Sequence, residues 1–213
     1  MPRLVRVEFL TSAASDAGLP RDGLAQVALV GRSNVGKSSL INALTRSRTA
    51  RTSAAPGKTR LLNVYRLEAP GFTPPRFYLV DLPGYGYARG GEAAAEGFDR
   101  LVGDYFALPP AAREAPRGTP LGPTAVVLVV DARHPGLAAD VAAMRWLEAQ
   151  ARPVLVAASK IDKLTRAGRQ RAERDWTTAL NVPVLPFSAA TGEGLDQLWT
   201  QISRLLSSRL SPR

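Results

Sequence analysis

The sequence predicts an α/β fold in which a mostly parallel central sheet is covered by helices on both faces. Short apolar segments of strand length alternate along the chain with segments of helical periodicity, and this alternation is typical of such folds. Residues 124–131 form an almost continuously apolar run, as expected of a strand that is covered on both sides. The chain has 213 residues, which is enough for one domain with a sizeable core.

The first half of the chain predicts three strands and one helix. Residues 26–31 are a short apolar run that ends in glycine, and residues 38–44 have the composition of a helix. Residues 61–68 alternate between apolar and polar, as in a half-exposed strand, and residues 76–81 predict another strand.

The second half of the chain, beyond the apolar run at residues 124–131, predicts two further buried strands, at residues 153–159 and 182–189. Apolar residues at helical spacing predict helices at residues 137–150 and 194–208. The apolar face of the last helix consists of Leu195, Leu198, Ile202, Leu205 and Leu206.

We expect a single domain at residues 26–208. A lead-in segment at residues 1–25 is expected to pack on this domain, and residues 209–213 form a tail. Residues 109–123 are rich in Pro and Gly and predict a mobile loop, and we expect a second mobile loop at residues 88–97.

The composition excludes several classes of protein. The chain has no cysteine, so disulfides and thiolate metal sites are excluded. No apolar run approaches the roughly 18 residues of a membrane helix, and acidic and polar residues interrupt the short apolar stretch near the N-terminus. We therefore expect a cytoplasmic protein without membrane contact. The sequence does not reveal the oligomeric state, and a monomer is the default expectation.

The charge of the chain favours a polyanionic partner. The formal net charge is +10 and the pI is about 10.8, which favours contact with nucleic acid over a basic composition that serves only solubility. The segment from residue 46 to residue 66 contains basic residues and no acid, unlike an ordinary solvated face. Its basic residues are Arg46, Arg48, Arg51, Lys58, Arg60 and Arg66.

Residues 31–38, GRSNVGKS, fit the phosphate-loop pattern of a glycine, four residues and then Gly-Lys-Ser. A predicted strand precedes the motif and a predicted helix follows it, as this motif requires. Backbone N–H groups of such a loop wrap a phosphate, and the helix N-terminus adds partial positive charge. We expect Lys37 to reach the β- and γ-phosphates of a nucleotide, and the Ser38 hydroxyl to bind Mg²⁺.

Asp81 is the last residue of a predicted strand and the first residue of the sequence DLPG. In folds with a phosphate loop, an acid at the end of a second strand holds the Mg²⁺, usually through water. Gly84, three residues later, can offer its backbone N–H to the γ-phosphate. The combination of Asp81 with the phosphate loop favours a metal site over a simple turn.

Residues 158–164, ASKIDKL, resemble the Asn/Thr-Lys-x-Asp signature of guanine-nucleotide-binding proteins. The Asp162 carboxylate suits guanine, because the N1–H and 2-amino groups of guanine are adjacent donors, whereas adenine would leave the carboxylate unpaired. The stem of Lys160 would lie along the base. Ser159 departs from the usual Asn or Thr and has less reach, so we expect a lower affinity.

Residues 187–194, FSAATGEG, support the same interpretation. Ser188 and the backbone N–H of Ala189 match the loop that meets the O6 atom of guanine in such proteins. The order of these motifs along the chain also matches, and together they favour GTP over ATP.

Two threonines between the phosphate loop and Asp81 are candidates for the Mg²⁺ shell. Thr59 is the better placed when a γ-phosphate is present, and Thr52 is the alternative, because only spacing and the adjacent Pro-Gly separate the two. A threonine in this role makes a loop that orders with GTP and relaxes with GDP.

The expected site therefore combines five segments. We expect the catalytic groups to be Lys37, Thr59 and Gly84, and the Mg²⁺ ligands to be Ser38, Thr59 and Asp81. The expected nucleotide contacts are Gly31, Arg32, Ser33, Asn34, Val35, Gly36, Lys37, Ser38, Ser39, Gly57, Lys58, Thr59, Arg60, Leu61, Asp81, Leu82, Pro83, Gly84, Ser159, Lys160, Ile161, Asp162, Phe187, Ser188 and Ala189.

Five motifs in order resemble the EngB family of small bacterial GTPases. They are GRSNVGKSSLINAL, ARTSAAPGKTRLLN, VDLPGYGYA, VVDARHP and SKIDKL. The resemblance implies the three-layer sandwich of a P-loop GTPase, Mg²⁺ dependence, a role in assembling the large ribosomal subunit, and a requirement for normal division septation. The basic segment, with Arg46, Arg48, Arg51, Lys58 and Arg60, agrees with contact to rRNA phosphates.

Tyr85 stands where many GTPases have a glutamine that orients the attacking water. Tyrosine has no amide for this task, so we expect slow intrinsic hydrolysis, on the order of 10⁻⁴ s⁻¹, with catalysis completed by rRNA, a ribosomal protein or a monovalent cation. Asn34 resembles the potassium ligand of some cation-dependent GTPases, which makes K⁺ a further candidate cofactor. Hydrogen bonding within the phosphate loop is the alternative role of Asn34.

Two other functions remain open from the sequence alone. Tyr85 is compatible with a GTP-binding scaffold that does not hydrolyse. An ATP-using P-loop enzyme is disfavoured by Asp162 and by the loop that contains Ser188.

Overall fold

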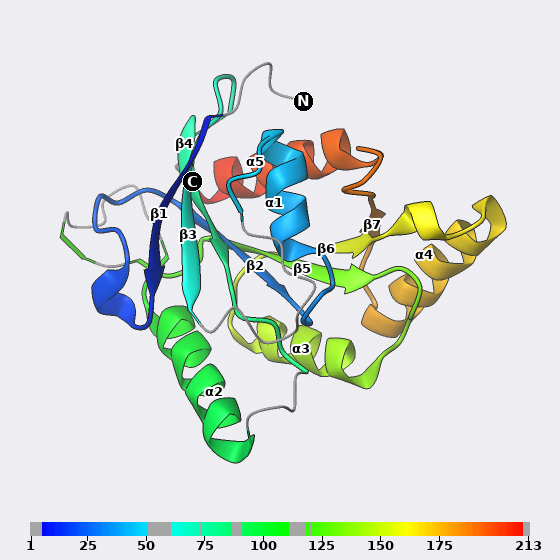
Figure 1. Cartoon of the computed structure of the whole chain (residues 1–213), viewed down its shortest axis with the longest axis horizontal. Helices are drawn as coiled ribbons and strands as arrows, with labels where there is room; N and C mark the ends of the chain where they lie inside the picture. Colours follow the sequence, from blue (N-terminus) through cyan, green and yellow to red (C-terminus); the bar gives the residue numbers. More distant parts are fainter. Residues whose placement is uncertain are drawn as a thin grey trace.

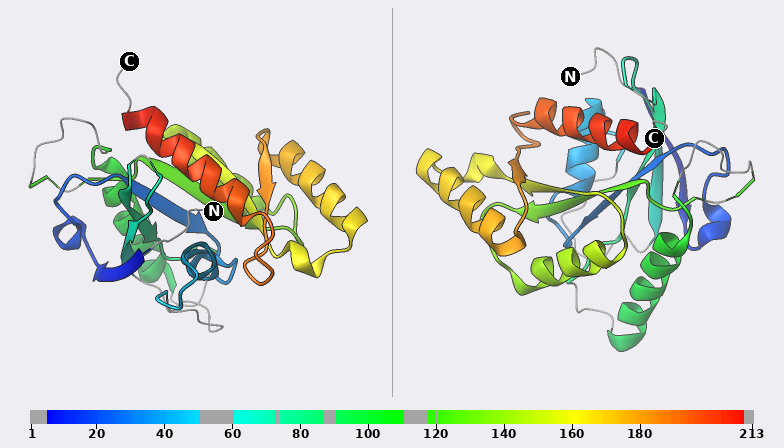
Figure 2. Two further views of the ribbon diagram at one scale, coloured as in Figure 1. Left: turned by 90° about the horizontal axis from the view of Figure 1, so that it is seen from above. Right: turned by 180° about the vertical axis from the view of Figure 1, so that it is seen from behind.

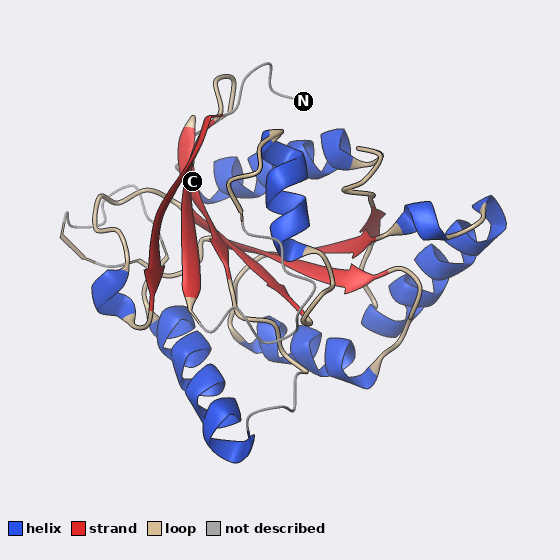
Figure 3. Ribbon diagram, viewed as in Figure 1, coloured by secondary structure: helices blue, strands red, loops and turns tan. Residues whose placement is uncertain are grey.

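The computed structural model describes residues 6–50, 61–72, 74–86, 91–110, 118–119 and 121–210, with only the backbone given for 91–98 and 209–210. These residues contain a seven-stranded sheet in the order β1-β3-β4-β2-β5-β6-β7 (Figure 1). Helices lie on both sides of this sheet (Figure 3). The predicted α/β three-layer fold is therefore confirmed.

Five neighbouring strands of the sheet are parallel. Strands β2 and β5 are buried along their whole length, because both of their faces are covered by helices. The parallel strands are β4 (Arg76–Asp81), β2 (Gln26–Gly31), β5 (Ala125–Asp131), β6 (Val154–Ser159) and β7 (Val184–Pro186).

Two antiparallel strands extend the sheet on one side. Strand β3 (Leu62–Glu68) pairs with β4, and β1 (Arg6–Ala13) pairs with β3 at the sheet edge. Residues 6–13 belong to the expected lead-in segment at residues 1–25, for which the sequence predicts no strand. Most of their side chains are exposed or partly exposed, so no alternating apolar pattern marks the strand.

The helices divide between the two faces of the sheet (Figure 2). α1 (Lys37–Thr45) and α5 (Leu195–Leu210) pack on one face, where Trp199 is buried and its indole N–H donates to the Leu44 carbonyl at 3.1 Å. The other face is covered by α2 (Gly91–Ala107), α3 (Ala138–Ala149) and α4 (Arg166–Leu180).

The prediction of a mobile loop at residues 88–97 is wrong from Gly91 onward, because α2 begins there. The apolar residues that hold this helix against the sheet, Val102, Tyr105 and Phe106, lie beyond residue 97. The first turns, GEAAAEG, therefore lack the apolar periodicity that marks the other predicted helices, although Ala and Glu favour a helix.

The ends of the second predicted loop, residues 109–123, lie close together. The Gly122 N–H donates to the Pro109 carbonyl at 2.8 Å, and Leu121 is buried. Residues 111–117 and 120 lie outside the described residues. None of the helices in the described part of the chain has both the length and the apolarity to cross a membrane.

Candidate nucleotide-binding site

The candidate site lies where four parallel strands end at one edge of the sheet. Strand β2 ends at Gly31, β4 at Asp81, β5 at Asp131 and β6 at Ser159. The register pairs Asp131 with Ser159 directly, and Asp81 with Leu29 of β2. Ligands of open parallel sheets bind at this edge, outside the carboxyl ends of the strands.

The phosphate loop connects β2 to α1. Asn34 and Gly36 have positive φ angles of 62° and 113°, which turn the backbone sharply before the helix. A Cβ atom at Gly31 would lie 2.5 Å from the Val129 carbonyl oxygen, so only glycine allows β2 and β5 to approach so closely here. The loop therefore ends with the N-terminus of α1 directed at the space above the sheet edge.

Lys37 lies inside the phosphate loop. Its ammonium group donates to the carbonyl oxygens of Gly31 at 2.9 Å and Arg32 at 3.2 Å, and the side chain is buried. Burial lowers the pKa of Lys37, and the negative charge of Asp81 opposes this effect. A buried ammonium group favours an anionic ligand close by.

Asp81 is buried beside Ser38. The Ser38 hydroxyl donates to Oδ2 of Asp81 at 2.6 Å, whereas Oδ1 is buried and has no hydrogen-bond partner among the described residues. Burial raises the pKa of Asp81, and Lys37 and Ser38 oppose the rise. An oxygen-only pair with an unsatisfied carboxylate oxygen fits Mg²⁺, which prefers hard oxygen ligands.

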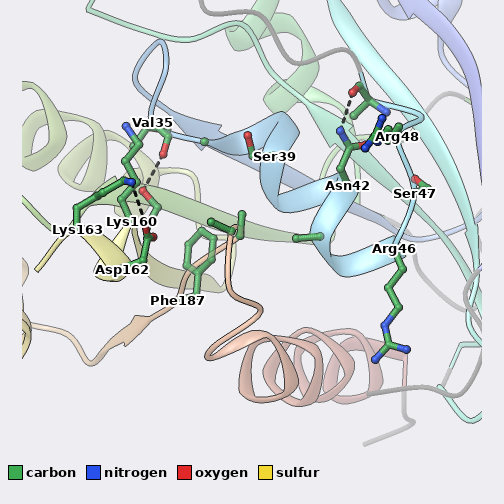
Figure 4. Close-up of a pocket in the computed structure, with 16 residues that line it drawn as sticks. Val35, Ser39, Asn42, Arg46, Ser47, Arg48, Lys160, Asp162, Lys163 and Phe187 are labelled. Carbon is green, nitrogen blue, oxygen red and sulfur yellow. Dashed lines mark hydrogen bonds and ion pairs between the residues drawn. The ribbon is translucent and has the colours of Figure 1, made fainter.

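A cavity of about 860 Å³ lies next to the phosphate loop (Figure 4). Lys160, Asp162 and Phe187 line one side, and Asn42 and Arg46 line the other. Its volume is within the usual range for a small-molecule site.

The Asp162 carboxylate is held at the wall of this cavity. The Ser188 hydroxyl donates to Oδ1 of Asp162 at 2.7 Å, and this hydrogen bond lowers the pKa of Asp162. The Ser188 oxygen in turn accepts from the backbone N–H groups of Ala190 and Thr191, both at 3.2 Å. The carboxylate is therefore ionised and fixed in orientation.

Ser159 lines the cavity and is hydrogen-bonded to the phosphate loop. Its buried hydroxyl lies 2.7 Å from the Val35 carbonyl and 3.0 Å from the Val130 carbonyl, so its single hydrogen is shared between the two. The phosphate loop is thereby joined to the ends of both β5 and β6.

Asp131 belongs to the site, although it is not among the site residues that the sequence predicts. The Lys160 ammonium group donates to Oδ2 of Asp131 at 2.9 Å and to the Asn34 carbonyl at 2.8 Å. Arg133 donates to the same carboxylate from its guanidinium at 2.9 and 2.8 Å. Burial alone would raise the pKa of Asp131, but the hydrogen bonds from Arg133 and Lys160 outweigh it and hold the pKa well below its usual range. An acid at the end of a fully buried strand was the available sequence signal.

Gly84 and Tyr85 lie against the phosphate loop. The Ser33 N–H donates to the Tyr85 carbonyl at 3.2 Å, and the Ser33 hydroxyl donates to the Gly84 carbonyl at 3.3 Å. The Tyr85 hydroxyl donates to Oδ1 of Asp140 in α3 at 2.7 Å. The phenol group is thus hydrogen-bonded to α3.

Other expected contacts have different placements. The side chains of Leu82 and Ile161 are buried in the core, so these residues can contact a ligand only through their backbones. Leu61 is exposed. The other expected contacts next to Leu61 lie outside the described residues; they are Gly57, Lys58, Thr59 and Arg60. Arg51 and Thr52, the alternative Mg²⁺ ligand, also lie outside them.

The phosphate loop, the acid at the end of β4 and the acid at the wall of the adjacent cavity are arranged on a mostly parallel sheet. This fold and site define the class of P-loop GTPases. Residues 26–160 match the family described as "50S ribosome-binding GTPase".

Curated relatives agree with this class over nearly the whole chain. A probable GTP-binding protein EngB from Pelotomaculum thermopropionicum is 41% identical over 207 residues, covering 95% of this chain and 96% of the relative. A probable EngB protein from Solibacter usitatus is 39% identical, covering 96% and 98%. The chain belongs to the EngB family of GTP-binding proteins.

Solved structures share the fold. The crystal structure of a probable GTP-binding protein EngB matches with a TM-score of 0.62 and 25% identity, over 87% of this chain and 100% of that one. The structure of Era in complex with MgGDPNP and a segment of 16S ribosomal RNA matches with a TM-score of 0.67 over 89% of this chain and 58% of that one. The identity to Era is 21%, so this likeness shows the fold alone.

We predict that Asp131→Asn weakens GDP and GTP binding together, by roughly tenfold, because Lys160 loses an ionic hydrogen bond that orients it between the phosphate loop and the base. Isothermal titration with each nucleotide measures this. Asp22→Asn is the matched control, because Asp22 accepts a hydrogen bond from Tyr78 and takes no part in this site. Unchanged affinity in Asp131→Asn would contradict the prediction.

Proposed function

We propose that this protein is a slow GTP-hydrolysing switch that assists assembly of the large ribosomal subunit in the cytoplasm. The observation that carries the proposal is the Asp162 carboxylate, fixed by Ser188 at the wall of a cavity beside the phosphate loop. The match to a family described as 50S ribosome-binding supports the ribosomal part. A requirement for normal division septation is supported only by the family resemblance.

The proposed nucleotide contacts follow from the chemistry of each group. Backbone N–H groups of the phosphate loop bind the phosphates, and Lys37 neutralises charge on the β- and γ-phosphates. Asp162 accepts from the N1–H and 2-amino groups of guanine, and the Ala189 N–H donates to O6. Ile161 is expected to contribute only through its backbone.

The proposed metal ligands are Ser38 and Asp81, with Thr59 as a further ligand when GTP is bound. Magnesium would neutralise charge on the phosphates and orient them. The unsatisfied, buried Oδ1 atom of Asp81 supports an oxygen-binding cation at this position.

The proposed hydrolysis is slow in the isolated protein. Tyr85 has no amide to orient water, and its hydroxyl is bonded to Asp140 of α3. Intrinsic turnover on the order of 10⁻⁴ s⁻¹ is therefore expected, as for other unassisted small GTPases. A group from the ribosome, or a monovalent cation, would complete catalysis.

The proposed ribosomal contact is the basic segment that follows α1. Arg46 and Arg48 lie at the edge of the nucleotide cavity, so a surface that contacts rRNA phosphates would also adjoin the bound nucleotide. Arg51, Lys58 and Arg60 complete the proposed contact surface. This proximity gives the bound nucleotide a direct route to influence ribosome affinity.

We predict that Asp162→Asn lowers GTP and GDP affinity by about 100-fold and shifts preference toward xanthine nucleotides, because the amide cannot accept from both guanine donors. Equilibrium binding of GDP, GTP, XTP, ADP and ATP with Mg²⁺ measures this on both proteins. Asp175→Asn, an exposed change in α4, is the control. Equal affinity of the unmodified protein for ATP and GTP would contradict the proposed function, because Asp162 would then not select guanine.

We predict that Arg46→Ala with Arg48→Ala weakens association with large ribosomal subunits. The slope of the logarithm of the association constant against the logarithm of the salt concentration is expected to become less steep by about 1 for each lost phosphate contact. Sedimentation over a range of salt concentrations measures both effects. Arg171→Ala with Arg174→Ala removes the same charge from exposed positions of α4 and is expected to leave binding nearly unchanged. Association that is insensitive to salt would count against this surface.

We predict that GTP turnover is faster in K⁺ than in Na⁺ at equal ionic strength, with Asn34→Ala abolishing the difference. Release of phosphate, with and without ribosomal subunits, measures this. Equal rates in the two salts would remove potassium from the list of cofactors. No turnover under any of these conditions, with GTP bound, would favour the scaffold function.

A further inference from the structure

Gly84 is fixed by an unusually close approach to the phosphate loop. A Cβ atom at Gly84 would lie 2.5 Å from the backbone nitrogen of Ser33, so the two backbones are in direct contact. Two hydrogen bonds from Ser33, to the carbonyls of Gly84 and Tyr85, hold this contact. Both bonds come from the phosphate loop, so they connect Gly84 and Tyr85 to that loop and to no other part of the molecule.

The third link to this segment comes from α3. The Tyr85 hydroxyl donates to Oδ1 of Asp140 at 2.7 Å, and the tyrosine ring packs against the apolar core that α2, α3 and α4 form with the sheet. A hydrogen bond from a phenol to a carboxylate is strong, because its acceptor is charged. Tyr85 is therefore tied at its backbone to the phosphate loop and at its hydroxyl to α3.

Asp140 is fully buried, although an acid in the first turn of a helix can stabilise that helix while it is exposed to solvent. Its exposed fraction is 0%, and its Oδ2 atom has no hydrogen-bond partner within the described ranges. Burial raises the pKa of Asp140, while Tyr85 and the positive charge of Arg32 oppose the rise. Burial of an incompletely satisfied carboxylate is costly, so it suggests a role in addition to helix stability.

We propose that Asp140 is a positioning residue for GTP: through Tyr85 it holds Gly84 where the backbone N–H of Gly84 meets the γ-phosphate. The inference rests on the proposed function and assigns part of the nucleotide response to a residue outside the phosphate-loop, DLPG and base-binding motifs. Asp140 itself touches no nucleotide. It acts by keeping the phenol of Tyr85 engaged on α3, which limits the backbone freedom of the adjacent glycine.

The hydrogen bond from Tyr85 to Asp140 is expected to affect the affinities for GTP and GDP differently. In the proposed set of nucleotide contacts Gly84 meets only the γ-phosphate, so GDP binding is expected not to depend on its position. When the link from Tyr85 to Asp140 is lost, the contacts with Ser33 alone hold Gly84. Gly84 then gains some conformational freedom that must be removed again when GTP binds. The link therefore contributes to GTP affinity and leaves GDP affinity unchanged.

The test compares the affinities for a non-hydrolysable GTP analogue and for GDP, both with Mg²⁺. Tyr85→Phe removes only the hydroxyl, and Asp140→Ala removes only its acceptor. Each is expected to weaken binding of the analogue by roughly tenfold, the effect of one charge-assisted hydrogen bond, and to change GDP binding by less than about twofold. Combining the two changes is expected to add little, because both remove the same link.

Two further variants separate positioning from general stability. Asp140→Asn keeps an oxygen acceptor of the same shape, so it is expected to restore analogue affinity relative to Asp140→Ala. Tyr78→Phe is the matched control, because the Tyr78 hydroxyl donates to Oδ2 of Asp22 at 2.6 Å, a bond of the same type away from Gly84. It is expected to leave the ratio of the two affinities unchanged.

The outcomes are distinguishable. The inference is overturned if Tyr85→Phe and Asp140→Ala leave the ratio of analogue to GDP affinity unchanged, or raise it. GDP binding reports that each variant is folded, and if Asp140→Ala fails to bind GDP, Tyr85→Phe and Asp140→Asn decide. Failure of the proposed function itself would appear earlier, as the absence of guanine selectivity in the unmodified protein.

Discussion

The shape of the site depends on hydrogen bonds from side chains to the carbonyl groups of the phosphate loop. Side chains of α1 and of the segment at the end of β6 bind four of these carbonyls. Of the loop N–H groups, those of Ser33 and Val35 donate to the Tyr85 and Arg32 carbonyls, and the N-terminus of α1 can still attract an anion. The loop is thus held in shape by protein groups in addition to any ligand. The pairs are Lys37 with Gly31 and Arg32, Lys160 with Asn34, and Ser159 with Val35.

Three acids near the same edge of the sheet are buried, and each is stabilised differently. The negative charge of Asp131 is balanced by hydrogen bonds from Arg133 and Lys160. Asp131 thereby orients Lys160, which also donates to the phosphate loop at the Asn34 carbonyl. Asp81 has one satisfied oxygen and one unsatisfied oxygen, as suits a carboxylate that receives a cation. Asp140 is bonded to Tyr85 and lies beyond the nucleotide cavity. Similar residues near one edge therefore have different surroundings, which suit the roles proposed for them in metal binding, lysine orientation and positioning.

The sequence was most informative where the structural requirement is local. The bounds predicted for two central strands, residues 26–31 and 76–81, coincide with β2 and β4, because apolar runs that end in glycine or an acid mark them directly. The fold class followed from the order of such segments. The edge strand β1 was missed because most of its side chains are exposed or partly exposed, and the start of α2 was missed because its first turns have no apolar face. No bounds were predicted for α4.

By itself, the sequence determined the fold class, the phosphate-loop motif and its position between a strand and a helix, since these depend on short-range periodicity and on glycines with special backbone angles. Only the tertiary structure decided which side chains complete the site. Lys160 meets Asp131 across 29 residues, Tyr85 meets Asp140 across 55, and Lys160 meets Asn34 across 126. Such pairs are set by strand order and register, and no local pattern in the sequence encodes them.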